Sequence, residues 1–298
     1  MTTPPTERNA PGVRPDWVSD ELFPFESRFV AVAGGHTLHY VDEGEGPLIL
    51  MHHGNPTWSF LYRDVIRGLR DRFRCVAVDL PGFGLSTEGP GYAFSPAEHA
   101  DVTTAFVKEL ELTGITPFVQ DWGGPIGLAV AGRMPERYDR LIIANTWAWP
   151  WDDLGPVIIS NVLGGPIGRE LILRFNLFAD RIVPLGHSKR TLTEAERTHY
   201  TFPFPTREAR IPTAVFPRAL SRSNAFLREV EAGLPALRSL PALILWAFKD
   251  VAFRKRELDR WQAELANHTL VTLPDANHYL QDDAAAEVVA AVTAWWDA

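Results

Sequence analysis

Val119-Gln120-Asp121-Trp122-Gly123-Gly124 is the stretch of sequence that decides the fold. Residues 118–120 end a short apolar strand, and the small residues of 123–132 predict a helix that begins directly after it. A strand that turns sharply into a helix forms a strained elbow, and the residue at its tip, here Asp121, is pushed into a reactive site. Because an aspartate is already ionised at neutral pH, it attacks an electrophilic carbon without a base and leaves an ester on the protein. The alternative is an aspartate that only caps the next helix.

Strand and helix signals alternate on both sides of this elbow. The predicted strands cover residues 25–33, 36–42, 48–52, 74–79, 118–120, 141–144, 243–246 and 270–273. The predicted helices cover residues 60–69, 96–112, 123–132, 254–265 and 283–296. The first two strands, joined by Gly34-Gly35, are expected to form a hairpin at the sheet edge. This order predicts an α/β-hydrolase fold, with a mostly parallel eight-stranded sheet flanked by helices.

The alternation stops over residues 147–221, where no strand pattern is apparent and apolar and aromatic residues are mixed with glycine and proline. An interruption at the carboxyl ends of two strands is where a lid belongs in an open α/β sheet. We therefore expect a helical cap over 147–221, inserted after the sixth strand, and a main domain formed by 21–146 and 222–298. Residues 1–20 are expected to be a flexible lead-in. The alternative for 147–221 is a set of core helices.

Composition limits the partners of this chain. Its 298 residues carry a net charge of −8, which disfavours nucleic acid and anionic membranes as partners. Cys75 is the only cysteine, so no intrachain disulfide is possible, and no apolar run approaches the roughly 18 residues of a membrane span. We expect a cytoplasmic protein without a metal or organic cofactor. The sequence leaves the oligomeric state open.

Two further polar residues follow predicted strands. Asp250 comes after the strand at 243–246, and His278 comes after the strand at 270–273. Asp121, Asp250 and His278 thus appear in the chain order nucleophile, acid, histidine of the α/β-hydrolase triad. His278 would take a proton from the water that attacks the ester, and Asp250 would hold the imidazole in the required tautomer. The alternatives are a loop histidine, one of nine in the chain, and an aspartate that only caps a turn.

Asn55 and Trp122 are the remaining candidates near the elbow. In this fold the backbone N–H after the nucleophile and one after the third strand form the oxyanion hole, and here they belong to Trp122 and Asn55. Their side chains are also hydrogen-bond donors. Two donors beside a nucleophilic carboxylate indicate a leaving group that departs as an anion, such as a halide. The alternative roles are a turn residue and a packing residue.

At this point the sequence resembles the haloalkane dehalogenases. The matching stretches are residues 53–63, 79–86, 120–124 and 277–282, and the likeness extends from about Leu22 to the C-terminus. The resemblance implies that Asp121 is the nucleophile, His278 the base, and Asn55 with Trp122 the halide-stabilising pair. It also implies hydrolysis of a small apolar haloalkane to the primary alcohol and halide, with water as the co-substrate.

Members of this family differ in the position of the acid. Some carry a glutamate just after the sixth strand, but here that place is Ala144-Asn145-Thr146, without a carboxylate. Asp250 is therefore the expected acid. Its combination with Asn55 is similar to the third branch of the family.

Two other functions are compatible with parts of this pattern. An epoxide hydrolase of the same fold usually needs two lid tyrosines to protonate the opened ring, whereas residues 147–240 contain only Tyr200. A catalytically silent binding module would not be expected to keep nucleophile, base and acid together. Within the cap we predict that Phe216, Pro217 and Trp147 line the substrate pocket.

Overall fold

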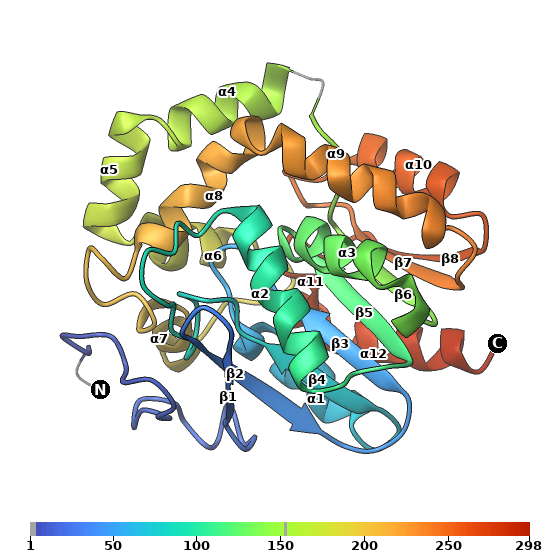
Figure 1. Cartoon of the computed structure of the whole chain (residues 1–298), viewed down its shortest axis with the longest axis horizontal. Helices are drawn as coiled ribbons and strands as arrows, with labels where there is room; N and C mark the ends of the chain where they lie inside the picture. The colour runs from blue at the N-terminus through green and yellow to red at the C-terminus, as the bar shows by residue number, and fades with distance from the viewer. Residues whose placement is uncertain (1–3, 152–153) are drawn as a thin grey trace.

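The computed structural model describes residues 4–151 and 154–298, and its centre is one eight-stranded sheet (Figure 1). The strands are β1 (Arg28–Val32), β2 (His36–Glu43), β3 (Leu48–His52), β4 (Arg74–Val78), β5 (Ile115–Gln120), β6 (Leu141–Ala144), β7 (Ala242–Ala247) and β8 (His268–Leu273). Their order across the sheet is β1-β2-β4-β3-β5-β6-β7-β8. β1, β2 and β4 pair antiparallel, and the pairs from β4 and β3 to β8 are parallel. The predicted mostly parallel sheet with an edge hairpin is confirmed.

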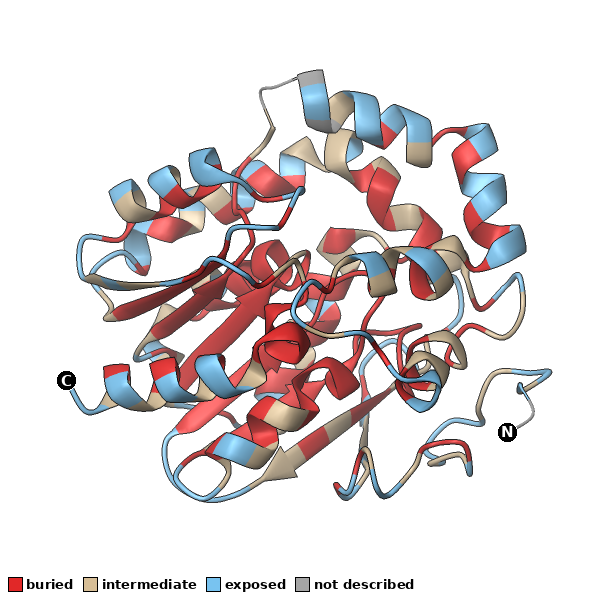
Figure 2. Ribbon diagram, turned by 180° about the vertical axis from the view of Figure 1, so that it is seen from behind, coloured by how far each residue is buried: buried red, intermediate tan, exposed pale blue. Residues whose placement is uncertain are grey.

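The central parallel strands β3, β5, β6 and β7 are buried along their whole length because both faces of the sheet are covered, whereas the edge strand β8 is partly exposed. In β3, Leu48 and Leu50 belong to one core cluster, and Ile49 and Met51 belong to the other. The two clusters lie on opposite faces, since successive side chains of a strand point in opposite directions. Seen from behind, the sheet is almost entirely buried (Figure 2).

Helices cover both faces of this sheet. Those of the main fold are α1 (Arg63–Leu69), α2 (Pro96–Glu109), α3 (Gly123–Arg133), α9 (Asn224–Gly233), α10 (Lys255–Glu264), α11 (Leu280–Asp283) and α12 (Ala285–Trp296). The apolar residues of α2, α3, α9 and α10 join the first cluster, and those of α1 and α12 join the second. The fold therefore has three layers, helices on each face of a central sheet, and this frame fixes the positions of the strand ends and of the loops that follow them.

Further helices lie over the carboxyl ends of the strands (Figure 1). They are α4 (Leu154–Leu163), α5 (Pro166–Phe175), a π-helical turn (Phe178–Ile182), α6 (Val183–Leu185), α7 (Glu194–Thr201) and α8 (Ile211–Arg222). No strand occurs in the described part of 147–221, in agreement with the sequence pattern. None of the described helices is long and apolar enough to cross a membrane.

Part of the segment 1–20, expected to be a flexible lead-in, contacts the folded chain, and residues 1–3 lie outside the described residues. Trp17 and Val18 are buried in the second core cluster, and the Arg14 guanidinium donates hydrogen bonds to the carbonyls of Phe23 and Phe25. The polar, proline-rich composition gave no sign of these contacts, because they come from single side chains rather than from a periodic apolar face. Besides Trp17 and Arg14, the Arg8 guanidinium donates to the Ser86 carbonyl at 3.1 Å.

Candidate active site

The elbow at Asp121 has the strained backbone that the sequence predicted. Asp121 has a φ of +50°, in the left-handed region that side chains other than glycine rarely adopt. Gly123 directly follows the turn, and a Cβ there would lie 2.2 Å from the carbonyl oxygen of His52. The turn is therefore tight because α3 begins against the end of β3. This packing lifts the Asp121 carboxylate above the carboxyl edge of the sheet.

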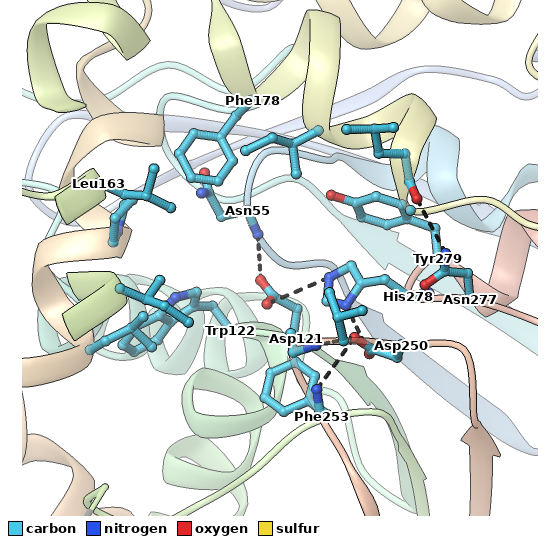
Figure 3. Close-up of a pocket in the computed structure, with 18 of the residues that line it drawn as sticks. Asn55, Asp121, Trp122, Leu163, Phe178, Asp250, Phe253, Asn277, His278 and Tyr279 are labelled. Carbon is cyan, nitrogen blue, oxygen red and sulfur yellow. Dashed lines mark hydrogen bonds and ion pairs between the residues drawn. The ribbon is translucent and has the colours of Figure 1, made fainter. Parts of the chain in front are cut away.

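The Asp121 carboxylate lies in a cradle of backbone donors. The Asn55 N–H donates to Asp121 Oδ1 at 2.8 Å (Figure 3). Gly54 leaves room for this contact, since a Cβ at that position would lie 2.3 Å from Oδ1. Burial raises the pKa of Asp121, and the His278 charge and the N–H groups of Trp122 and Asn55 only partly oppose this rise. The other oxygen, Oδ2, is directed towards His278.

His278 lies between the two aspartates (Figure 3). Its Nε2 is 3.7 Å from Asp121 Oδ2, and its Nδ1 is 3.0 Å from Asp250 Oδ2. Burial lowers the pKa of His278, but the carboxylates of Asp250 and Asp121 outweigh it and leave the pKa above 6.5. The structure thus brings Asp121, His278 and Asp250 together from three different strand ends.

Asp250 is fully buried and is held by several donors. The Ala252 N–H donates to Asp250 Oδ1 at 2.7 Å, and the Asn145 side-chain amide donates to Oδ2 at 3.0 Å. Asn145 also accepts from the N–H and donates to the carbonyl of Ala247, so its amide orientation is fixed. Asn145 therefore occupies the position after β6 where the sequence lacks a carboxylate. Its side-chain amide donates to the carboxylate of Asp250, which follows β7.

Gln120 is a second positioning residue that sequence reasoning missed. Its side-chain nitrogen lies 3.1 Å from the His278 carbonyl and 3.2 Å from His278 Nε2. Because a carbonyl only accepts, the nitrogen and not the oxygen of the amide must face His278. The sequence feature that could have identified Gln120 is its position at the end of the buried strand β5, directly before Asp121.

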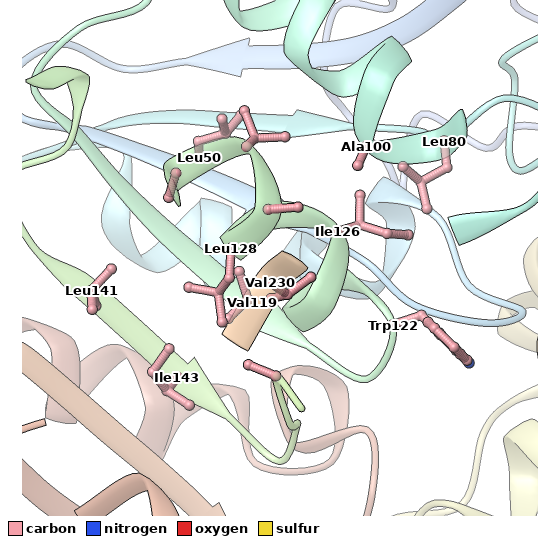
Figure 4. Close-up of a cluster of buried hydrophobic side chains, with 14 of the residues drawn as sticks. Leu50, Leu80, Ala100, Val119, Trp122, Ile126, Leu128, Leu141, Ile143 and Val230 are labelled. Atoms are coloured by element: carbon pink, nitrogen blue, oxygen red, sulfur yellow. The ribbon is translucent and has the colours of Figure 1, made fainter. Parts of the chain in front are cut away.

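The side chains of Asn55 and Trp122 line the same cavity as Asp121. The Trp122 ring forms part of the first core cluster (Figure 4) and packs edge-on against Trp147, with ring centroids 4.7 Å apart. Its indole N–H has no hydrogen-bond acceptor among the described residues. The Asn55 amide nitrogen donates to the carbonyl of Thr213 on α8 at 3.4 Å.

The cavity above Asp121 has a volume of about 380 Å³ and mostly apolar walls. Its lining includes Trp147, Trp151, Leu163, Phe178, Ile182, Pro217, Leu220, Phe253 and Tyr279. Trp147 and Pro217 were expected in this lining, but Phe216 is not part of it. Phe216 is fully buried behind Trp122, with ring centroids 5.1 Å apart, and also contacts Phe83. Consecutive residues of a helix point in different directions, so Pro217 faces the cavity and Phe216 faces the core.

Comparison with known proteins places this site in a family. The model of the alpha/beta hydrolase fold family matches residues 47–166. Haloalkane dehalogenase 2 of Mycobacterium tuberculosis is 44% identical over 274 residues, which cover 91% of this chain and 95% of that protein. The chain belongs to the haloalkane dehalogenase family. A cis-3-alkyl-4-alkyloxetan-2-one decarboxylase of Shewanella oneidensis is 33% identical, with 91% of this chain and 88% of that protein covered.

Solved structures agree with this family. The crystal structure of the haloalkane dehalogenase DbeA from Bradyrhizobium elkani matches with a TM-score of 0.80 at 27% identity, covering 91% of this chain and 99% of that one. The resemblance inferred from the sequence motifs is therefore confirmed for the family and for the fold. As a member of the haloalkane dehalogenase family, the chain is an enzyme.

Proposed function

We propose that this enzyme hydrolyses haloalkanes to a primary alcohol and a halide. The observation that carries the proposal is a carboxylate at the elbow tip, beside a histidine–aspartate pair, at the floor of an apolar cavity. A serine at this place would make an ester by attack on a carbonyl. A carboxylate instead displaces a leaving group from carbon and becomes an alkyl ester itself.

In the first step Asp121 Oδ2 attacks the carbon that bears the halogen. The N–H of Asn55 holds Oδ1, which leaves Oδ2 free to form the new bond. The carbon–halogen bond breaks, and its electron pair leaves with the halide. An unpaired anion in an apolar cavity would cost several kcal/mol, so the indole N–H of Trp122 and the amide of Asn55 have a clear role as halide donors.

In the second step His278 takes a proton from a water, and the resulting hydroxide attacks the carboxyl carbon of the ester. Asp250 orients and stabilises the imidazolium that forms. The backbone N–H groups of Asn55 and Trp122 then stabilise the tetrahedral oxyanion, an effect of about 10²–10³ in rate per donor. Collapse of this intermediate breaks the bond from the carboxyl carbon to the alkyl-bearing oxygen, and the alkoxide takes the proton from the His278 imidazolium and leaves as the alcohol. The Asp121 carboxyl group then loses the proton that came with the hydroxide to solvent, which restores the carboxylate.

Charge coupling between Asp121 and His278 supports this sequence of steps. The Asp121 charge is one of the causes that raise the pKa of His278. Formation of the ester removes that charge, so the pKa of His278 falls when the ester forms. His278 thus becomes more completely neutral at the moment when it must act as a base.

The experiment that tests this function is bromide release from 1-bromohexane by the wild type, the Asp121→Ala variant and the Asp275→Ala variant. Asp275 is exposed in the loop before His278 and serves as a matched control. We expect release by the wild type and Asp275→Ala, and none above background by Asp121→Ala. A wild type that is inactive on bromoalkanes of several chain lengths would overturn the proposal.

We also propose that the chain belongs to the third branch of the haloalkane dehalogenase family, because it combines Asn55 with an acid at Asp250.

Ring opening of an oxygen-containing substrate is the second candidate, because the hydroxyl of Tyr279 is a polar group of the cavity lining. Attack of Asp121 on the alkyl carbon of a four-membered lactone would expel a carboxylate, an anion to which the same donors fit. Tyr200, the cap tyrosine weighed for an epoxide hydrolase, instead donates to Asp282 at 2.6 Å and is fully buried. Assays with a 3,4-dialkyl oxetanone and with an epoxide panel, measured beside 1-bromohexane, distinguish these activities.

A further inference from the structure

Pro217 interrupts the hydrogen bonding of α8 at a place that faces the active site. It lies inside this helix and lines the cavity. In an α-helix the N–H of each residue donates to the carbonyl four residues earlier, and a proline has no N–H to donate. The carbonyl that loses its helical donor here is that of Thr213. Thr213 is fully buried, so solvent water cannot easily replace the missing donor.

The side chain of Asn55 supplies the replacement. Its amide nitrogen donates to the Thr213 carbonyl at 3.4 Å, across the junction between the cap helix and the loop after β3. A carbonyl only accepts, so this contact fixes which end of the amide is nitrogen. The amide carries two hydrogens, and one is used by Thr213. The other remains for a ligand in the cavity that Asn55 and Trp122 line together.

We propose that Pro217 is a positioning residue for halide binding, which acts by freeing the Thr213 carbonyl to orient the Asn55 amide. The inference rests on the proposed dehalogenase function and deepens it, because it connects the cap to the leaving-group site. Without a freed carbonyl the Asn55 amide is held only through its backbone, and either its oxygen or its nitrogen can face the cavity. An oxygen there would repel a halide.

The Pro217→Ala variant tests this directly, since alanine restores an N–H that can donate to Thr213 within the helix. The matched control is Pro212→Ala in the first turn of the same helix. There the carbonyl four residues earlier, that of Glu208, already accepts from the Ile211 N–H at 3.0 Å. Both variants keep the catalytic groups, and alanine is a better helix former than proline.

Two readouts separate positioning from a general loss of structure. The first is the bromide dissociation constant, measured by product inhibition of 1-bromohexane turnover. The second is the single-turnover rate of bromide release compared with the rate of ester hydrolysis. We expect Pro217→Ala to weaken bromide binding and slow bromide release by about fivefold, the scale of one hydrogen bond, with ester hydrolysis unchanged. Pro212→Ala should match the wild type.

A double-mutant cycle with Asn55→Ala completes the test. If Pro217 acts through Asn55, Pro217→Ala should have no further effect on bromide binding in the Asn55→Ala background. Additive effects would overturn the inference, and so would a Pro217→Ala variant that binds bromide as Pro212→Ala does. A wild type that releases no halide would instead remove the proposed function and this inference with it.

Discussion

The two sides of the cavity are built by different means. On the main-domain side, the reacting groups stand at strand ends and are fixed by hydrogen bonds, such as those from Asn145 and Ala252 to Asp250. On the cap side, apolar side chains line the cavity, and some lie at its open rim, where Ile159 is 51% and Leu185 is 76% exposed. From this difference we expect the strand ends of the sheet to determine the chemistry, and the helices over them to contribute most to substrate selection.

The largest effect should come from disturbing the main-domain side. In the Asp250→Asn variant, the Asn145 amide would face another amide and His278 would lose the acceptor that fixes its tautomer. By analogy with the serine-enzyme triad, we expect turnover to fall by about 10⁴. The first step does not need the base, so one equivalent of bromide should still be released in a burst. Rapid-quench measurement of bromide checks this.

Asp275→Asn is the matched control for that variant, because this aspartate is exposed and its ionic partner among the described residues is Lys249, at 3.4 Å. It should behave as the wild type. A loss of the burst together with turnover in Asp250→Asn would mean that Asp250 supports the nucleophile rather than the base, contrary to our account.

The junction between the two sides is the next place to disturb. Arg63 of α1 is buried and binds Asp282 of α11 and Glu196 of the cap helix α7, both at 2.8 Å. Burial would raise the pKa of Asp282, but Arg63 and His187 outweigh it and hold the pKa well below its ordinary range. Asp282→Asn leaves Arg63 with less compensating charge. We expect a loss of about 3–5 kcal/mol in the free energy of unfolding.

Chemical denaturation at pH 7 measures this loss. Asp297→Asn is the control, since Asp297 pairs with Arg72 at the exposed surface, where solvent screens the pair, and the substitution should leave the free energy of unfolding nearly unchanged. The contribution of Asp282 should be present above pH 3.8, the ordinary value for the unfolded chain, and be lost as the pH falls from there towards its depressed folded pKa. Equal effects of the two substitutions would show that the junction is not a buried charge network.

The cap side should respond with specificity rather than with rate. Phe178 lines the cavity from the π-helical turn, and Phe178→Ala enlarges the space above Asp121. We expect the ratio of kcat/KM for 1-bromohexane over 1-bromopentane to rise, within the roughly 10- to 200-fold range that one methylene can supply. The exposed Phe175, which is absent from the lining, is the control. An unchanged ratio with a lower rate on both substrates would contradict the division between the sides.

The smallest expected effect is a change in a single pKa. The pKa of His278 should lie above 6.5 in the resting enzyme, so the imidazolium form should already predominate at pH 6.5. Asp121→Asn replaces the carboxylate by a neutral group, as the ester does, and should lower the pKa of His278. Titration of the imidazole by NMR checks both values. A pKa that stays the same or rises in Asp121→Asn would contradict the proposed charge coupling.

Much of this architecture could be predicted because the relevant signals are local. Apolar runs set β3, β4 and β6 at or within one residue of the predicted bounds, and the residues after the strands mark the places where a parallel sheet collects its reacting groups. The resemblance of the motifs to those of the haloalkane dehalogenases also supports the halide-binding roles proposed for Asn55 and Trp122. Bringing Asp121, Asp250 and His278 together needed only the strand order of the fold.

The features that escaped prediction depend on contacts between distant segments. Asn145 supports Asp250 from 105 positions away in the sequence, and Asn55 contacts Thr213 across 158 positions. No sequence period encodes such pairs. The direction of Phe216 also escaped, because one residue of error along a helix turns a side chain by about 100°, from the cavity into the core.

The central claim is that Asp121 carries the alkyl group between two separate steps. Intact mass measurement of a His278→Phe variant after exposure to 1-bromohexane tests it most directly. Without its base the enzyme should stop at the ester, so the protein should gain the mass of one hexyl group, and peptide mapping should locate it on Asp121. Bromide release by the wild type with no adduct on the variant, or an adduct on another residue, would contradict the account.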